Sequence, residues 1–385
     1  MSYADSVQRM RYRRLPIEIE SPEERGYDTI RCNLTESSFT DGTLAEFDVK
    51  LSGEVPVAYG DHRGLPELRA LIAEASNPSG PPTLGPDDVV CTPGAAAALF
   101  FVATSLLEPG DHVLVEHTNY ATNLETPRVI GAAVEPLELR IDDAFHLDVD
   151  RVAGSIRPDT KLISVTSPHN PTGTVLSGDQ LEALVELAER HDLWLLVDET
   201  YRDMDPNPLP VAATMSTRAI SVSSMSKSYG LPGLRLGWAV TQHPEMQQRL
   251  LAAKEQVVIC GSALDEEAAR QVLQRRGEHL ERIVGTIAER KAVLLDWFKS
   301  QDWLDVVEPS AGVVCFPRLR EGVVDDVDGW YRAINDDGTF VGEGHWFDTD
   351  RRHFRLGFGW PTTEELRCGL ASLEAGAAAV RAAQR

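Results

Sequence analysis

Short apolar runs alternate with longer amphipathic segments along most of the chain. The short runs have the length of strands and are mostly apolar, as expected for strands covered on both faces. Between two of them, residues 178–191 carry Leu181, Leu184, Val185 and Ala188 at helical spacing, with acidic residues on the opposite face. This alternation predicts an α/β protein built on a parallel sheet. The predicted strands are residues 113–115, 162–165, 194–197, 219–222 and 236–240.

The last third of the chain has a different pattern. A long helical stretch, residues 264–299, is expected to bend or break near Gly277 and to lead from a large domain into a smaller one. Short strands and helices are mixed after it, which predicts an α+β domain. The strands are expected at residues 313–316 and 354–356, and the helices at residues 327–335 and 363–381.

These patterns divide the chain into three parts. Residues 1–45 begin with a polar stretch rich in arginine and glutamate, and are expected to form an arm that packs on the small domain or on a partner subunit. Residues 46–285 are predicted to form the large domain and residues 286–385 the small C-terminal domain. No internal repeat or low-complexity linker interrupts them.

Composition agrees with a globular protein of two domains. The chain has 385 residues, of which 42% are apolar and 25% charged. A net charge of −23 argues against a nucleic-acid partner, because the phosphate backbone would be repelled over most of the surface. The ten histidines show no clustering typical of a metal site, so no metal is predicted.

Several features predict a cytoplasmic protein. The N-terminal sequence has arginines but no apolar signal-peptide region after them. The longest apolar run, residues 95–107, is shorter than the roughly 20 residues that a membrane span needs. The cysteines are scattered without pairing or metal-like spacing, as expected for reduced thiols. They are Cys32, Cys91, Cys260, Cys315 and Cys368.

Candidate chemistry begins at Lys227, in the run Ser-Ser-Met-Ser-Lys-Ser-Tyr-Gly at residues 223–230. The run follows a predicted strand and places small hydroxyl side chains on both sides of the amine. Such a lysine can form a Schiff base while its neighbours hold a phosphate, which suggests pyridoxal 5′-phosphate. A lysine in a serine-rich loop is more often a solvated surface charge, so the interpretation depends on the other segments.

Three further segments supply what this cofactor needs. Gly94 and the alanines after it open a predicted helix whose free backbone N–H groups could bind an anion. Asn170 lies in a Pro-His-Asn-Pro-Thr-Gly turn after a strand, where its amide could donate to a phenolate oxygen. Asp198 ends another apolar strand, where a dry carboxylate could pair with a protonated ring nitrogen.

With these segments in this order, the chain resembles the class I/II aminotransferases over nearly its whole length; these are fold-type I enzymes that use pyridoxal 5′-phosphate. The resemblance implies an α/β fold with a mainly parallel seven-stranded sheet in the large, cofactor-binding domain and a smaller α+β C-terminal domain. It implies that Lys227 is the Schiff-base lysine and that Asp198 meets the ring nitrogen. Asn170 and Tyr201 match the pair that bonds the ring O3′.

The resemblance extends to the remaining site residues. Tyr120 matches the aromatic residue that stacks on the ring, and Arg355 the arginine that binds the substrate α-carboxylate, a task that suits a planar guanidinium. Tyr59 matches the tyrosine that reaches the phosphate of the neighbouring subunit, which implies a homodimer. The positions that match the phosphate-binding site are Ala95, Ala96, Ser224, Ser226 and Arg235.

Each residue taken alone has an ordinary structural interpretation. Asp198 could simply end a strand, Asn170 could belong to a simple turn, and Tyr120 and Tyr201 could be core aromatics. Arg355 lies in an apolar strand, where an unpaired guanidinium is costly to bury, so an anion must meet it. That anion could be a substrate carboxylate or a structural Asp or Glu.

Two segments depart from the family pattern at the expected edges of the substrate pocket. Residues 33–39 replace a Gly-Glu-Pro-Asp-like turn, so Glu36 and Ser37 could hold a polar or cationic side chain, or the loop could be a harmless variant. Glu343 stands where a proline is usual. The stretch 226–238 is also similar to that of an arginine-processing cyclase of the family. These departures favour a role in specialised amino acid biosynthesis over a housekeeping one.

The motifs predict deprotonation of an L-amino acid at Cα but leave its outcome open. Transamination is the first hypothesis, and elimination, replacement or cyclisation at Cβ or Cγ is the second. A Ser-x-x-Lys acyl-transfer enzyme is disfavoured because no Lys-Thr-Gly follows Lys227 and no Ser-Asp-Asn is found. A cofactor-binding transcription regulator would need a basic DNA-binding module, for which this acidic chain has no room.

Overall fold

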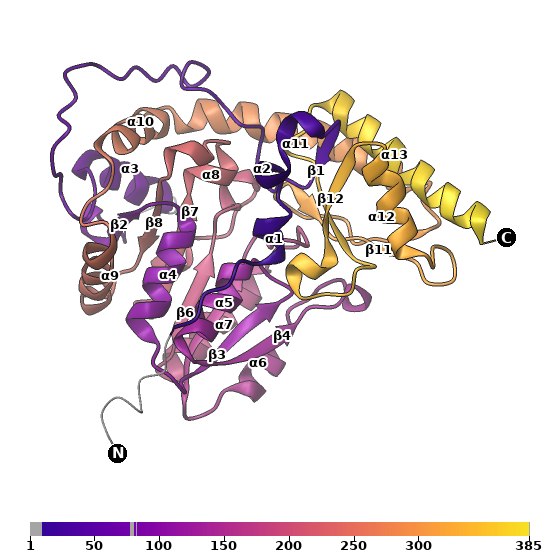
Figure 1. Ribbon diagram of the computed structural model, residues 1–385. Coiled ribbons are helices and arrows are strands. Elements are labelled where there is room, and N and C mark those ends of the chain that lie inside the picture. The colour runs from indigo at the N-terminus through magenta and orange to yellow at the C-terminus, as the bar shows by residue number, and fades with distance from the viewer. Residues whose placement is uncertain (1–9, 78–80, 82, 385) are drawn as a thin grey trace.

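A seven-stranded sheet forms the centre of the larger part of the molecule in the computed structural model, which describes residues 10–77, 81 and 83–384 (Figure 1). The strand order is β2-β8-β7-β6-β5-β3-β4, and β8 alone runs antiparallel to its neighbours. The predicted mainly parallel sheet is therefore confirmed. The strands are β2 (Val89–Thr92), β3 (His112–His117), β4 (Ala133–Glu138), β5 (Thr160–Thr166), β6 (Trp194–Asp198), β7 (Ala219–Ser224) and β8 (Gly237–Val240).

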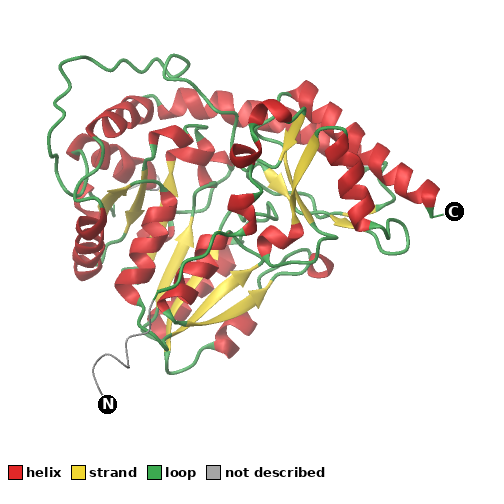
Figure 2. Cartoon of the chain, in the orientation of Figure 1, coloured by secondary structure: helices red, strands yellow, loops and turns green. Residues whose placement is uncertain are grey.

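Helices cover both faces of this sheet (Figure 2). Leu114 and Ile163 pack with α6 and α7 on one face, whereas Val113 and Leu162 pack with α4, α5 and α9 on the other. Successive side chains of a strand point to opposite faces, so the central strands carry apolar side chains toward both faces. The helices are α3 (Pro66–Ser76), α4 (Ala95–Leu106), α5 (Ala121–Ile130), α6 (Val149–Ser155), α7 (Gly178–Arg190), α8 (Met225–Ser228), α9 (Pro244–Val257) and α10 (Ala263–Gln274).

The smaller part contains a four-stranded sheet of order β1-β12-β13-β10 and a two-stranded sheet of β11 and β9. The helix that leads into it begins directly after Arg275, so the break expected near Gly277 is confirmed. The strands are β1 (Cys32–Leu34), β9 (Leu304–Asp305), β10 (Val314–Cys315), β11 (Arg318–Leu319), β12 (Thr339–Glu343) and β13 (Phe354–Gly357). The helices are α11 (Arg276–Phe298), α12 (Val327–Asp336) and α13 (Thr363–Ala383).

The N-terminal segment joins the smaller part through β1, which pairs in parallel with β12 so that Cys32 lies opposite Thr339. Two short helices, α1 (Pro16–Ile19) and α2 (Pro22–Arg25), precede this strand. Residues 1–9 of the predicted arm lie outside the described residues. The boundary expected at residue 285 lies within the continuous helix α11.

After β1 the chain runs around the outside of the large sheet before it enters α3, as the long indigo loop in Figure 1 shows. Tyr59 lies in this segment and is 82% exposed. No helix among the described residues combines the length and the apolar character that a membrane crossing requires.

Candidate active site

Three neighbouring parallel strands end at one edge of the large sheet and bring distant residues together there. In the register of β5, β6 and β7, Thr166 lies opposite Asp198, and Asp198 lies opposite Val222. The turn with Asn170 follows β5, and helix α8 with Lys227 follows β7. The carboxyl ends of parallel strands are where α/β proteins bind ligands, so strand order alone assembles these groups.

A second group of segments meets beside this edge. Gly237 at the start of β8 lies opposite both Thr92 of β2 and Ser224 of β7. Helix α4 begins three residues after β2, and its N-cap, Gly94, offers no side-chain acceptor to the first turn. A Cβ atom on Gly94 would lie 2.7 Å from Nη2 of Arg235, so this close approach requires glycine. Free N–H groups and a guanidinium therefore face one another, which suits a phosphate.

The two groups of residues line one cavity of about 260 Å³. The structure places every residue predicted for the site in its lining except Tyr59, which lies on the outer segment. These lining residues are Glu36, Ser37, Ala95, Ala96, Tyr120, Asn170, Asp198, Tyr201, Ser224, Ser226, Lys227, Arg235 and Arg355. Lining residues that the sequence did not indicate include Glu18, Glu23, Thr35, Thr166, Thr200 and Trp346.

Arg355 on β13 brings a guanidinium from the smaller part into the cavity. The residue is only 5% exposed, and its Nη1 donates to Asn170 Oδ1 at 3.1 Å while its Nη2 donates to the Thr35 carbonyl at 2.6 Å. Its Nε has no hydrogen-bond partner, and no Asp or Glu among the described residues lies within 4.0 Å of it. Since burial also lowers the pKa of Arg355, the cavity provides a strong site for an anion.

Burial shifts the proton affinities of the two central groups in opposite directions. It lowers the pKa of the Lys227 ammonium, although the nearby Glu36 carboxylate opposes this shift. It raises the pKa of the Asp198 carboxyl, although the hydroxyl and backbone N–H of Thr200 donate to Asp198 Oδ1 at 2.6 and 3.1 Å. No cation among the described residues pairs with Asp198, so a cationic ligand group would compensate its charge.

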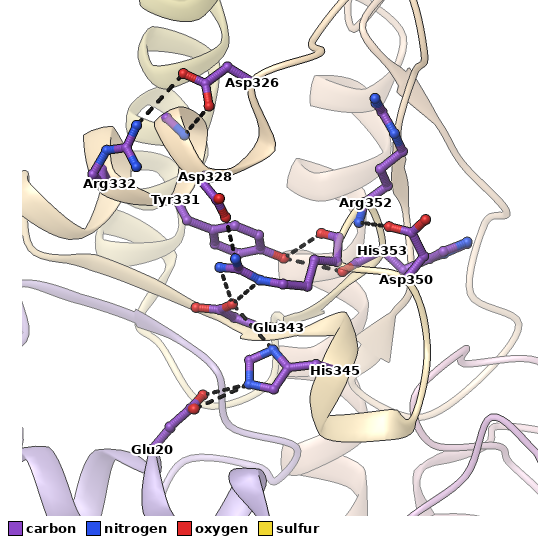
Figure 3. A network of polar contacts seen from close by, with 12 residues as sticks. Glu20, Asp326, Asp328, Tyr331, Arg332, Glu343, His345, Asp350, Arg352 and His353 are labelled. Atoms are coloured by element: carbon purple, nitrogen blue, oxygen red, sulfur yellow. Dashed lines mark hydrogen bonds and ion pairs between the residues drawn. The ribbon is translucent and has the colours of Figure 1, made fainter.

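A polar network attaches the N-terminal segment to the smaller part (Figure 3). Glu20, directly after α1, accepts from Trp346 Nε1 at 2.6 Å and lies 3.0 Å from His345 Nε2. On its other side, His345 Nδ1 lies 3.3 Å from Glu343 Oε2, which also accepts from Arg351 at 2.7 Å. Glu343 therefore lies in this network and not in the cavity lining, which corrects its expected place at the pocket edge.

The network predicts that attachment of residues 16–25 depends on pH. The carboxylates of Glu343 and Glu20 raise the pKa of His345 above its ordinary value of 6.5, despite partial burial. The stabilisation is complete below pH 6.5 and is lost as the pH rises through the raised pKa of His345. A partly exposed pair contributes at most about 1 kcal/mol, so hydrogen exchange of residues 16–25, corrected for intrinsic rates, should accelerate up to about fivefold. In His345→Gln this pH dependence should disappear; an unchanged pH dependence in the variant would contradict the assignment.

Comparison with known proteins identifies the class of enzyme to which this site belongs. The sequence pattern described as aminotransferase class I and II matches residues 39–373. The chain is 31% identical to arginine–pyruvate transaminase AruH of Pseudomonas aeruginosa over 72% of this chain and 70% of that protein. It is 29% identical to capreomycidine synthase of Streptomyces vinaceus over 87% of this chain and 86% of that protein.

Solved structures agree in fold. A PLP-dependent aminotransferase from Streptococcus suis superimposes with a TM-score of 0.85 at 26% identity, covering 94% of this chain and 97% of the other. Aspartate aminotransferase from Thermotoga maritima gives a TM-score of 0.82 at 26% identity, covering 92% and 94%. The chain belongs to the class I/II aminotransferase family, with the fold-type I architecture that its sequence predicts.

Membership of the family makes the chain a transferase whose cofactor is pyridoxal 5′-phosphate. The cavity fits this group in three separate observations. Arg235 and the uncapped start of α4 suit a phosphate. Asp198 is a buried carboxylate that no described cation pairs with, and Lys227 is an amine at the same edge. These residues would hold the phosphate, the ring nitrogen and the aldehyde carbon.

Proposed function

We propose that this enzyme transfers the amino group of an L-amino acid to a keto acid, and that Lys227 is its central catalytic residue. The observation that carries the proposal is the convergence of Lys227, Asp198 and the unpaired Arg355 on one cavity. When bound, pyridoxal 5′-phosphate supplies an electron-withdrawing ring that makes the substrate Cα–H bond acidic. The protein must then orient the substrate and move one proton.

The substrate carboxylate binds Arg355, whose two donor bonds to Asn170 and Thr35 fix the plane of the guanidinium. This docking fixes Cα relative to Lys227. Because burial lowers the pKa of Lys227, its neutral Nζ can accept the Cα proton at moderate pH and return it to another carbon. Asn170, Tyr201 and Tyr120 would hold the ring, and Ser224, Ser226, Ala95, Ala96 and Arg235 would hold the phosphate. All of these residues line the cavity.

A second candidate is elimination, replacement or cyclisation at Cβ or Cγ. The observation that favours it is the similarity to capreomycidine synthase over most of the chain, together with the polar lining contributed by Glu36 and Ser37. These reactions use the same removal of the Cα proton by Lys227, so the two candidates differ in the product released.

A panel of L-amino acids, including arginine and aspartate, tests the choice between the two. Amino transfer should convert the absorbance of the holoenzyme to that of the pyridoxamine form and release one keto acid per site. Recovery of ammonia or of a cyclised product, with the cofactor still an aldehyde, would establish the second candidate. If no amino acid changed the spectrum of the holoenzyme or was consumed by it, both candidate functions would be contradicted.

The active unit is proposed to be a homodimer in which Tyr59 reaches the phosphate of the neighbouring subunit. Large apolar side chains are exposed on the segment before His62 and on the segment after Glu255, and these two residues lie 2.6 Å apart. A second copy of the chain could cover these side chains. Sedimentation of the purified protein tests this assembly. The exposed side chains are Leu44, Leu51, Val57, Tyr59, Val257, Ile259 and Leu264.

The proposal also retains the division into an arm of residues 1–45, a large domain of residues 46–285 and a small domain of residues 286–385. A cytoplasmic location is supported by the cysteines, all five of which are free. A role in specialised amino acid biosynthesis is supported by the departures around Glu36. Cell fractionation and the identity of the amino donor test these two points.

A further inference from the structure

We propose that three carboxylates at the mouth of the cavity, those of Glu18, Glu23 and Glu36, select amino acids whose side chains end in a positive charge. This inference rests on the proposed function and narrows its substrate to cationic amino acids, with a guanidinium or ammonium group at the end of a flexible chain. We call these three residues the acidic rim.

No member of the acidic rim forms an ion pair with a residue that the structure describes. None of its carboxylates lies within 4.0 Å of a Lys, Arg or His nitrogen in the part of the chain that the structure describes. Glu36 Oε1 accepts a hydrogen bond of 3.0 Å from the Tyr27 hydroxyl, which fixes the side chain without neutralising it. Glu36 is half-buried, so its charge is less screened than those of the exposed Glu18 and Glu23, and it acts on Lys227 and Arg355 without forming an ion pair with either.

The opposite charge in the same cavity gives the bound substrate a direction. Arg355 is 5% exposed, and its Nε has no hydrogen-bond partner among the described residues. It provides the anion site for the α-carboxylate. Glu36 follows Thr35, whose carbonyl accepts from Arg355. A substrate anchored by its carboxylate at Arg355 therefore extends its side chain past Glu36 toward the exposed members of the rim.

The segment that carries the two outer carboxylates is attached to the smaller part through Glu20, which Figure 3 shows beside His345. Glu18 and Glu23 flank Glu20, whose carboxylate is bound by His345 and Trp346. The ring of Trp346 also lines the cavity, where its face can contact a cation. The rim therefore combines one fixed carboxylate, that of Glu36, with two exposed carboxylates on an attached segment, and together they attract a cationic side chain and repel an acidic one.

Arginine and citrulline form the matched pair that tests the inference, since the two differ in charge but scarcely in shape. With the holoenzyme, the half-reaction kcat/KM for arginine should exceed that for citrulline by about tenfold to fiftyfold, and glutamate should be a still poorer donor. In the triple variant Glu18→Gln, Glu23→Gln, Glu36→Gln the arginine-to-citrulline ratio should fall to about threefold or less. The ratio is the readout because Glu36 also acts on Lys227, an effect that both donors share and that therefore cancels. Citrulline turnover reports on the integrity of each variant.

Glu24→Gln is the control. Glu24 lies on the same short helix as Glu23, α2, but it pairs with Arg14 at 2.6 Å and does not line the cavity. This variant should keep the wild-type ratio. Binding without chemistry gives a second measurement: calorimetry should show that 5-guanidinopentanoate binds the holoenzyme more tightly than 5-ureidopentanoate, and that the triple variant loses this preference.

The outcomes separate the inference from the proposed function. Equal use of arginine and citrulline, or a ratio that the triple variant does not change, would overturn the inference while amino transfer stands. Preferential binding of the guanidino acid without transfer from any amino acid would retain the acidic rim and reject the proposed function.

Discussion

Replacing Lys227 with alanine is expected to lower the rate of amino transfer by a factor of at least about 10⁴, because the variant loses both its covalent link to the cofactor and its general base. No other lysine lines the cavity among the described residues, so no second amine can take over either task. Stopped-flow absorbance of the half-reaction measures the rate. Borohydride reduction of the wild-type holoenzyme, followed by peptide mapping, should place the pyridoxyl group on Lys227.

Lys291→Ala is the matched control for this experiment. Burial lowers the pKa of Lys291 too, but its Nζ donates to the Ser310 carbonyl at 3.0 Å outside the cavity lining. This variant should therefore keep nearly all activity. A Lys227→Ala enzyme that retained a tenth of the wild-type rate, or a pyridoxyl group found on another lysine, would contradict the assigned role.

The central groups of the site could be predicted because they follow strands that the apolar pattern makes plain. Asn170, Asp198 and Lys227 come soon after or at the ends of three apolar runs, and these runs form adjacent parallel strands. Parallel order places the three residues at one edge without further information. Local pattern and global fold agree here, so local sequence suffices.

Two of the strands that the pattern did not reveal, β4 and β1, lack this local signal. β4 contains Pro136 and two glutamates, which an edge strand tolerates but a central strand does not. β1 is three residues long and forms only by pairing with β12, about 300 positions away. Such strands depend on long-range contacts, which periodicity does not encode.

The acidic rim shows the same limit for function. Glu18 and Glu23 lie in a charged N-terminal stretch with no motif, and they line the cavity in a segment that His345 and Trp346 attach through Glu20. Glu343 was expected at the pocket edge from its position in the sequence alone, yet Arg351 and His345 draw its carboxylate into the network. In both cases, contacts between segments that are far apart in the sequence determine where the carboxylates lie.

Replacing Arg355 with alanine is expected to reduce kcat/KM for the preferred amino acid by about 10²- to 10³-fold, mainly through a higher KM. The reason is that a buried charge-assisted contact to the α-carboxylate, worth about 2–5 kcal/mol on truncation, is lost. Arg355→Lys should recover only part of this loss, because an ammonium cannot bond Asn170 and the Thr35 carbonyl while also presenting two parallel donors to a carboxylate.

Two comparisons isolate the carboxylate contact. Arg352→Ala removes a nearby arginine whose Nη1 donates to the Val324 carbonyl away from the cavity, and it should leave KM unchanged. Amine donors that lack a carboxylate should react equally slowly with the wild-type enzyme and with Arg355→Ala, since neither uses the anion site. A KM for the amino acid that stayed at the wild-type value in Arg355→Ala would remove Arg355 from the substrate site and assign its unpaired guanidinium to another anion.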